Sequence, residues 1–198
     1  MYLEFKRTHV YNSCMDKRET KTRKSLYEAF KECLKTKDYN SISISDLLSK
    51  SGVSRSTFYS HFKSKDDVLK ALCNEIFDHV FAPTQTKESD HDFSNSSTFD
   101  YTRMITHVFY HFYDKQELIR EILVCGGAPI FLETLKERTY PLFSACIKSR
   151  IYYKEGISEE IQIHQISESF VSLIRYYVEN GCKLSPEELM EIFNKLYQ

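Results

Sequence analysis

The sequence predicts an all-α protein, and two observations carry this prediction. Apolar residues recur every three or four positions along most of the 198 residues, a spacing that places them on one face of a helix. Pairs of a Ser or Asp with an acidic residue three positions later mark several helix starts. Strand-like alternation is nearly confined to the run SISIS at 41–45, which we interpret as the approach to a helix capped by Ser43.

These paired residues are capping boxes, and they divide the chain into helices. In such a box the first side chain accepts a hydrogen bond from an unpaired backbone N–H, and the acidic side chain returns a bond to the first residue's N–H. The last box also has a proline in the favoured first helical position, Pro186. The predicted boxes pair Asp16 with Glu19, Ser43 with Asp46, Ser64 with Asp67, Asp114 with Glu117, and Ser185 with Glu188.

The run SGVSRSTFYSHFKSK at 51–65 predicts a tight turn followed by a short helix. Gly52 follows the helix SDLLSKS where a left-handed residue is needed, and Ser54 can cap the next helix. One side of that helix is apolar and would pack on the helices before it, through Val53, Phe58 and Phe62. The other side is small, polar and basic, which suits a helix that enters a DNA major groove about 12 Å wide. This side carries Arg55, Ser56, Tyr59 and Ser60.

The charge is distributed unevenly although the chain as a whole carries only −1. Residues 1–65 hold 14 Lys and Arg against 7 Asp and Glu, whereas the remainder holds 13 against 21. A basic N-terminal part attached to an acidic remainder is typical of a protein that meets a polyanion with one end. Nucleic acid is the partner that this pattern favours.

Composition excludes several other classes of protein. No apolar run reaches the roughly 18 residues of a membrane span, and the first residues lack the apolar block of a signal peptide, so we expect a cytoplasmic protein without a membrane partner. The six cysteines show no C-x-x-C spacing and are interpreted as reduced thiols, most of them in the core.

The stretch ISISDLLSKSGVSRSTFYSHFKSKDDVLKAL at 42–72 resembles the DNA-binding signature of the tetracycline-repressor (TetR) family of transcriptional regulators. The resemblance covers about a third of the chain. It implies a three-helix, helix-turn-helix domain, a connecting helix, and a larger helical domain that binds a ligand and dimerises. We therefore expect an N-terminal extension at 1–15, a DNA-binding domain at 16–64, and a ligand-binding and dimerisation domain at 65–198.

The resemblance also assigns roles at the DNA. The third helix would lie in the major groove of a pseudo-palindromic operator. Arg55, Ser56 and Thr57 would face bases, and Tyr59, His61 and Lys65 would face bases or phosphates. Ser43 matches family positions that contact phosphate, and phosphate contact is also the role we expect for Lys63. Residues 169–197 are similar to the closing helix pair of a branch that includes regulators related to dihydroxyacetone-kinase activators, although the tryptophan common in that branch is absent.

Two features after the first 65 residues bear on a ligand. The polar, serine-rich segment at 82–100 is expected to be a flexible loop, and GGAP at 126–129 is expected to break the helical run. The helices beyond the loop carry more aromatic and aliphatic side chains than a thin bundle needs, which predicts an apolar pocket for a small-molecule effector. The candidate pocket residues are Met104, Val108, Phe112, Phe131 and Phe170.

The helix predicted at 158–180 has more than one apolar stripe, with Val171 and Val178 on a second side. A helix that is apolar on two sides needs two covers, and a second copy of the chain is the simplest second cover. We therefore expect a homodimer built with the helix at 185–197. The expected interface residues are Phe170, Ile174, Tyr177, Leu189 and Phe193.

Enzyme and metal-site patterns are weak. His107 and His111 have a spacing that can serve one metal ion, but no third ligand follows at motif spacing. Ser60 and Lys63 match the S-x-x-K of serine acyl enzymes without its companion motifs. We therefore expect that the protein is not an enzyme and binds no metal or cofactor. We expect a repressor that a small molecule releases from DNA. The alternative is a regulator whose C-terminal domain binds a partner protein and which acts as an activator.

Overall fold

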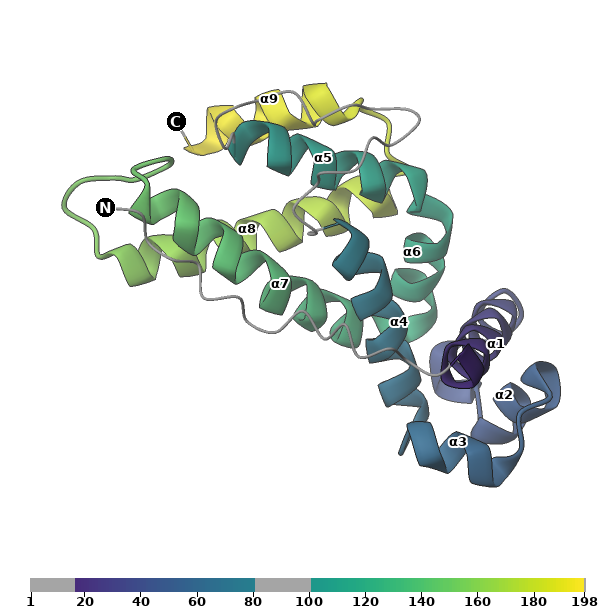
Figure 1. The fold of residues 1–198 in the computed structure, drawn as a ribbon. Helices are drawn as coiled ribbons and strands as arrows, with labels where there is room; N and C mark the ends of the chain where they lie inside the picture. The colour runs from purple at the N-terminus through teal and green to yellow at the C-terminus, as the bar shows by residue number, and fades with distance from the viewer. Residues whose placement is uncertain (1–16, 81–100, 198) are drawn as a thin grey trace.

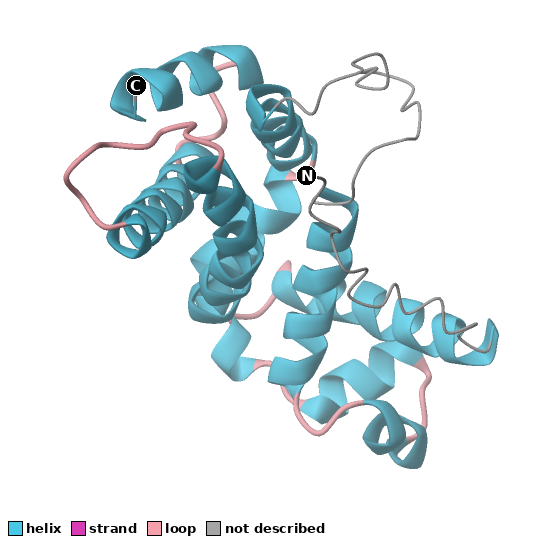
Figure 2. Ribbon diagram, turned by 60° about the vertical axis from the view of Figure 1, so that its left-hand side comes forward, coloured by secondary structure: helices cyan, strands magenta, loops and turns pink. Residues whose placement is uncertain are grey.

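The computed structural model describes residues 17–80 and 101–197, and these residues form helices without any strand (Figures 1 and 2). The expected N-terminal extension, Asp16 of the first capping box and the expected flexible loop at 82–100 lie outside the described residues. Among the described residues, no helix has the length and hydrophobicity needed to cross a bilayer.

The N-terminal unit contains α1 (Lys17–Leu34), the short 3₁₀ turn η1 (Tyr39–Ser41), α2 (Ile44–Ser51) and α3 (Arg55–His61). The predicted turn between α2 and α3 is confirmed, because Gly52 adopts a left-handed conformation with φ 68° and Ser54 accepts a bond from the Thr57 N–H. Phe58 and Phe62 are buried as expected, in a core shared with α1 and α2.

Helix α4 (Lys65–Val80) joins this unit to the C-terminal helices (Figure 1). Its predicted capping box is confirmed by bonds in both directions between Ser64 and Asp67. Apolar side chains of α4 such as Leu69 and Phe77 are fully buried, and α4 contacts both α1 and α7. The two parts of the chain therefore share one hydrophobic core.

The C-terminal part contains α5 (Tyr101–Asp114), α6 (Gln116–Ile122), the π-helical turn η2 (Leu123–Gly127), α7 (Ala128–Lys148), α8 (Glu159–Glu179) and α9 (Pro186–Tyr197). Helix α8 runs along α7 and also contacts α5, while α9 lies on α5 (Figure 1). The expected break at GGAP is present, since Gly126 has φ 91° inside η2 and α7 begins at Ala128.

Of the two capping boxes predicted after residue 100, one is confirmed and one is wrong. Ser185 and Glu188 form the expected box, with bonds in both directions. The box predicted for Asp114 and Glu117 is wrong, because Asp114 is the last residue of α5 and the N-cap of α6 is Lys115, whose side chain makes no capping bond.

The expected dimer interface requires a correction. Phe170, Ile174, Tyr177, Leu189 and Phe193 are all at most 3% exposed within a single chain. The physical reason is that α8 is covered twice by its own domain: Phe170 contacts Phe143 of α7, Phe109 of α5 and Phe193 of α9. Val171 and Val178 of the second stripe are buried as well. These side chains therefore belong to the core of a single chain.

The candidate pocket residues pack on other rings. Phe112 and Phe131 have ring centroids 6.4 Å apart, and both lie against Phe77 of α4, at 6.2 and 5.2 Å. Phe170 belongs to a different aromatic cluster, where it stacks on Phe109 at 5.4 Å. Val108 is fully buried and Met104 is half-buried. The structure brings Phe112 and Phe131 together and places Phe170 apart from them.

The described cysteines are free thiols, and most of them are buried. Burial raises the pKa of the Cys73 and Cys146 thiols to about 12 and that of Cys182 to about 11. Thiols with such pKa values carry little reactive thiolate at neutral pH. This agrees with their expected role in the core.

We predict that Phe170→Ala lowers the free energy of unfolding by about 3–5 kcal/mol, because it leaves a cavity among three other phenylalanine rings. Ser172→Ala is the matched control on the same helix, since Ser172 is exposed, and it should change stability by less than about 0.5 kcal/mol. Urea unfolding followed by circular dichroism measures both. Equal stability of the two variants would contradict the burial of Phe170.

Candidate DNA-binding surface

The exposed side of α3 carries the polar and basic residues that the sequence placed there. Arg55, Ser56, Tyr59 and Ser60 are exposed, and Tyr59 presents 49% of its surface although it is aromatic. Phe58 on the opposite side is fully buried and packs edge-on against the Tyr59 ring at 5.3 Å. The buried ring thus fixes how far the helix rotates and keeps Arg55 and Tyr59 outward.

The N-terminus of α2 lies beside the start of α3. The Arg55 guanidinium donates to the Ser45 hydroxyl at 3.4 Å, which joins the two helices at the surface. Ser45 was not among the residues expected at the DNA. Its position in the first turn of a capped helix was the only sequence signal that could have indicated a place at this surface.

Ser43 is the N-cap of α2, and its predicted capping box is confirmed. The Asp46 carboxylate accepts bonds from the Ser43 N–H at 2.9 Å and the Ser43 hydroxyl at 2.8 Å, and the Asp46 N–H donates to Ser43 Oγ. Lys37 donates to the same carboxylate at 2.7 Å. The Lys37 ammonium and the bonds from Ser43 hold the pKa of Asp46 well below its ordinary value. Lys37, which the sequence analysis did not single out, therefore adds a cation beside this helix start.

The remaining residues assigned to DNA occupy different environments. Thr57 is half-buried, and its hydroxyl lies 2.8 Å from Ser54 Oγ, within the cap of α3. His61 is also half-buried, and its Nδ1 lies 3.9 Å from a carboxylate oxygen of Glu19 on α1. Lys63 is exposed, directly after α3.

Lys65, which was expected at the DNA, is half-buried and binds the backbone around the turn η1. Its ammonium donates to three backbone carbonyls, those of Tyr39 at 2.7 Å, Asn40 at 3.1 Å and Ile42 at 3.0 Å. It also lies 4.5 Å from the centroid of the Tyr39 ring. An ammonium has three N–H donors, and carbonyls of the chain occupy all of them.

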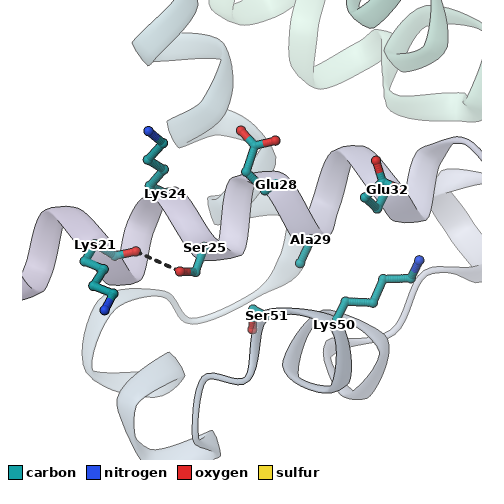
Figure 3. Close-up of a pocket in the computed structure, with 8 residues that line it drawn as sticks. All are labelled: Lys21, Lys24, Ser25, Glu28, Ala29, Glu32, Lys50 and Ser51. Carbon is teal, nitrogen blue, oxygen red and sulfur yellow. Dashed lines mark hydrogen bonds between the residues drawn. The ribbon is translucent and has the colours of Figure 1, made fainter.

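A groove of about 520 Å³ lies on the same unit, between α1 and the C-terminal end of α2 (Figure 3). Ala29 of α1 and Ser51 of α2 lie on its two sides, and Lys50 extends toward Glu32. Because Lys21, Lys24 and Lys50 line it together with Glu28 and Glu32, the groove offers no clear preference for an anion or a cation. We assign it no function.

His107 and His111 form a buried pair on α5. Their Nε2 atoms lie 2.8 Å apart, so one Nε2–H donates a hydrogen bond and the other Nε2 accepts it. Both side chains are at most 4% exposed. Within the described ranges, no group of three or more His, Cys, Asp or Glu is arranged to hold a metal ion. The two side chains form a hydrogen bond within the core.

Family models match both parts of the chain. The model described as "Bacterial regulatory proteins, tetR family" matches residues 26–72, and the model described as "Transcriptional regulator C-terminal region" matches residues 100–198. The curated HTH-type transcriptional regulator YxbF of Bacillus subtilis (strain 168) is 38% identical over 79 residues, which are 37% of this chain and 21% of that protein. The dhaKLM operon transcriptional activator DhaS of Lactococcus lactis subsp. lactis (strain IL1403) is 31% identical over 70 residues, 35% of each chain. This chain thus spans about a fifth and a third of the lengths of these two relatives.

Solved structures extend the similarity to nearly the whole chain. A TetR transcriptional regulator from Streptococcus agalactiae 2603V superposes with a TM-score of 0.66 at 25% identity, over 94% of this chain and 99% of that one. The dihydroxyacetone kinase operon activator DhaS superposes with a TM-score of 0.60 over 89% of this chain and 93% of that one, and its 18% identity supports the fold alone. Because the C-terminal model matches half of the chain and the tetR model matches the helix-turn-helix, the chain belongs to the TetR family of transcriptional regulators.

Proposed function

We propose that the protein is a sequence-specific DNA-binding transcriptional regulator, a homodimer that represses transcription until a small-molecule effector releases it. The observation that supports this most directly is the outward side of α3, where Arg55, Ser56 and Tyr59 are exposed on a helix anchored by Phe58. Such a regulator needs no catalytic residue, metal or cofactor, and it works in the cytoplasm, where its DNA target lies.

Each exposed residue has a role suited to its chemistry. Arg55 is proposed to bond in bidentate fashion to guanine, and Tyr59 to contact thymine methyl groups or phosphate. The small side chains of Ser56 and Thr57 let the helix approach the bases. Lys63 is proposed to contact phosphate, together with first-turn amides of α2, which a helix leaves without an intrahelical partner. Ser43 is proposed to join them when its hydroxyl turns from the Asp46 carboxylate, to which it donates in the free protein, toward a phosphate. His61 is proposed to contact DNA at the edge of this surface.

The dimer is proposed to form through side chains that remain exposed on the last two helices. These include Ile161 and Tyr176 of α8, at 56% and 65% exposure, and Ile192 and Leu196 of α9, at 38% and 62%. Ser169 and Ser172 place small side chains on the outer side of α8 between Ile161 and Tyr176, so two such helices can approach closely. A dimer is needed because two recognition helices must enter successive major grooves about 34 Å apart.

The second candidate function is an activator that depends on a partner protein. The packing of Phe112 and Phe131 against Phe77 favours it, because a small molecule at the expected pocket must displace these rings. The relative DhaS is described as an operon activator, and the same role for this chain would fit a protein partner. A small-molecule effector would raise the melting temperature of the protein and weaken its binding to DNA. An activator of the second kind would bind its target promoter only together with the partner protein.

We predict a steep salt dependence of DNA binding, with the logarithm of the binding constant falling nearly linearly with the logarithm of salt concentration. Arg55→Ala should cost about 1–3 kcal/mol on the preferred duplex and relax base preference, because it removes a base contact. Lys63→Ala is the matched variant, and it should weaken all duplexes alike. Fluorescence anisotropy on a duplex selected from random sequences measures both. Binding that ignores salt, or no duplex selected at all, would refute the proposed function.

We predict that Tyr176→Asp combined with Leu196→Asp converts the dimer to a folded monomer and removes cooperative binding to a two-site duplex. Both side chains are exposed, so the charges should leave the core of each subunit intact. Tyr140→Asp on α7 is the control, since Tyr140 is also exposed but lies on another helix. Sedimentation velocity reports the masses. A dimer that survives the double substitution would place the interface elsewhere.

A further inference from the structure

The turn η1 sets where α2 begins. Only Ile42 and Ser43 separate the last residue of the turn from the first residue of α2, and Ile42 is buried. Ser43 then closes the capping box with Asp46. Any displacement of Tyr39–Ser41 must therefore carry Ser43 and the first turn of α2 with it.

Helix α4 holds this turn by two adjacent residues of its first turn. Lys65 donates to the carbonyls of Tyr39, Asn40 and Ile42, which converge on one ammonium. The hydroxyl of Tyr39 donates to the carboxylate of Asp66. Burial, followed by this bond to Asp66, raises the pKa of Tyr39, so the hydroxyl keeps its proton at neutral pH. The Tyr39 ring is only 6% exposed and lies against Phe30 of α1.

The corner between α6 and α7 approaches the same turn. A Cβ atom added at Gly126 would lie 3.8 Å from Tyr39 Cβ and 3.8 Å from Asn40 Nδ2. The next residue, Gly127, packs so closely that an added Cβ would lie 3.1 Å from Leu69 of α4 and 3.0 Å from Ile122 of α6. Cys125 donates its thiol to the Leu34 carbonyl at the end of α1 at 3.6 Å. The turn is thus enclosed by α4 and by the C-terminal helices.

We propose that Lys65 is a positioning residue for DNA binding: by holding the turn Tyr39–Ser41 against α4, it sets where Ser43 and the first turn of α2 meet the phosphate backbone. This inference rests on the proposed function. It gives α4 and the α6–α7 corner, both of which pack against the turn, a direct mechanical connection to the phosphate contacts of α2.

Direct phosphate contact by Lys65 is the competing role. It would require the ammonium to leave three carbonyl acceptors and the face of the Tyr39 ring. Lys63 offers the comparison within the same segment, because it is exposed and lies only two residues away. The two lysines carry the same charge, so a measurement that counts neutralised phosphates separates their roles.

The experiment measures the salt dependence of binding to the duplex that the parent protein selects from random sequences. Lys63→Met should weaken binding and lower the slope of log binding constant against log salt by about one, because one phosphate contact is lost. Lys65→Met should weaken binding by about tenfold or more, as expected when a bond to a charged phosphate is misplaced, with the slope unchanged. The slope stays because the phosphate contacts that Lys65 positions, the Ser43 hydroxyl and the first-turn amides of α2, are uncharged.

Lys65→Arg gives a second and opposite expectation. A planar guanidinium cannot direct three donors to carbonyls that converge on one point, so a positioning role predicts that arginine fails to restore affinity. A phosphate contact predicts that arginine retains it. A slope lowered by about one in Lys65→Met, unchanged affinity in that variant, or full affinity in Lys65→Arg would each overturn the proposal.

Tyr39→Phe tests the same turn with a smaller change. It removes only the bond to Asp66, so the protein should fold, and binding should weaken severalfold with the slope of the parent. Circular dichroism melts check the fold of every variant, and if Lys65→Met does not fold, Tyr39→Phe decides: unchanged affinity in that variant overturns the proposal. If the parent protein selects no duplex, the proposed function fails. If the parent binds a duplex and Lys65→Met changes the slope, only the positioning role of Lys65 fails.

Discussion

Burial of Phe58 and Phe62 beneath α3 is the interaction on which the candidate DNA-binding surface depends. A helix of seven residues is far too short to be stable alone in water. It persists because Ser54 caps its start and because the two rings, with centroids 6.0 Å apart, join the core made by α1 and α2. The polar side chains on the outer face are exposed, so the orientation of the helix is set by the buried side.

The same core continues through α4 into the C-terminal helices. Leu69 and Phe77 of α4 are both fully buried, and Phe77 lies against Phe131 of α7 at 5.2 Å. Surface pairs such as Lys70 with Glu137 add less, because exposed ion pairs contribute about 0–1 kcal/mol. The N-terminal unit therefore shares its core with α4, and we expect a change in packing around Phe77 to reach α3 through that core.

Features encoded within a few residues could be predicted from the sequence. Gly52 and the caps at Ser43 and Ser54 are local, because turn geometry and capping bonds involve neighbours in the chain. The partners of Lys65 could not be predicted this way, since the carbonyls it binds lie 23 to 26 residues earlier. Asp114 shows the limit even for local signals, because a residue suited to cap α6 is instead the last residue of α5.

Helix α8 shows why an apolar pattern alone does not identify a partner. Periodicity correctly predicted that Phe170 and Val171 are covered, but it carries no information on whether the cover comes from the same chain or from another. The covers are α7, α5 and α9, because the long α7 and α8 lie side by side and the aromatic rings of α5 and α9 fill the other side.

This arrangement leaves a thin outer side of α8 between its buried stripes. Phe170 on the inner side and Tyr176 on the outer side lie within two turns of one rigid helix. Interiors are packed as densely as organic crystals, so a change around Phe170 that shifts or rotates α8 also shifts the side on which we propose the dimer. If the dimer forms there, the core of the C-terminal helices and the spacing of the two recognition helices are connected through a single helix as well as through α4.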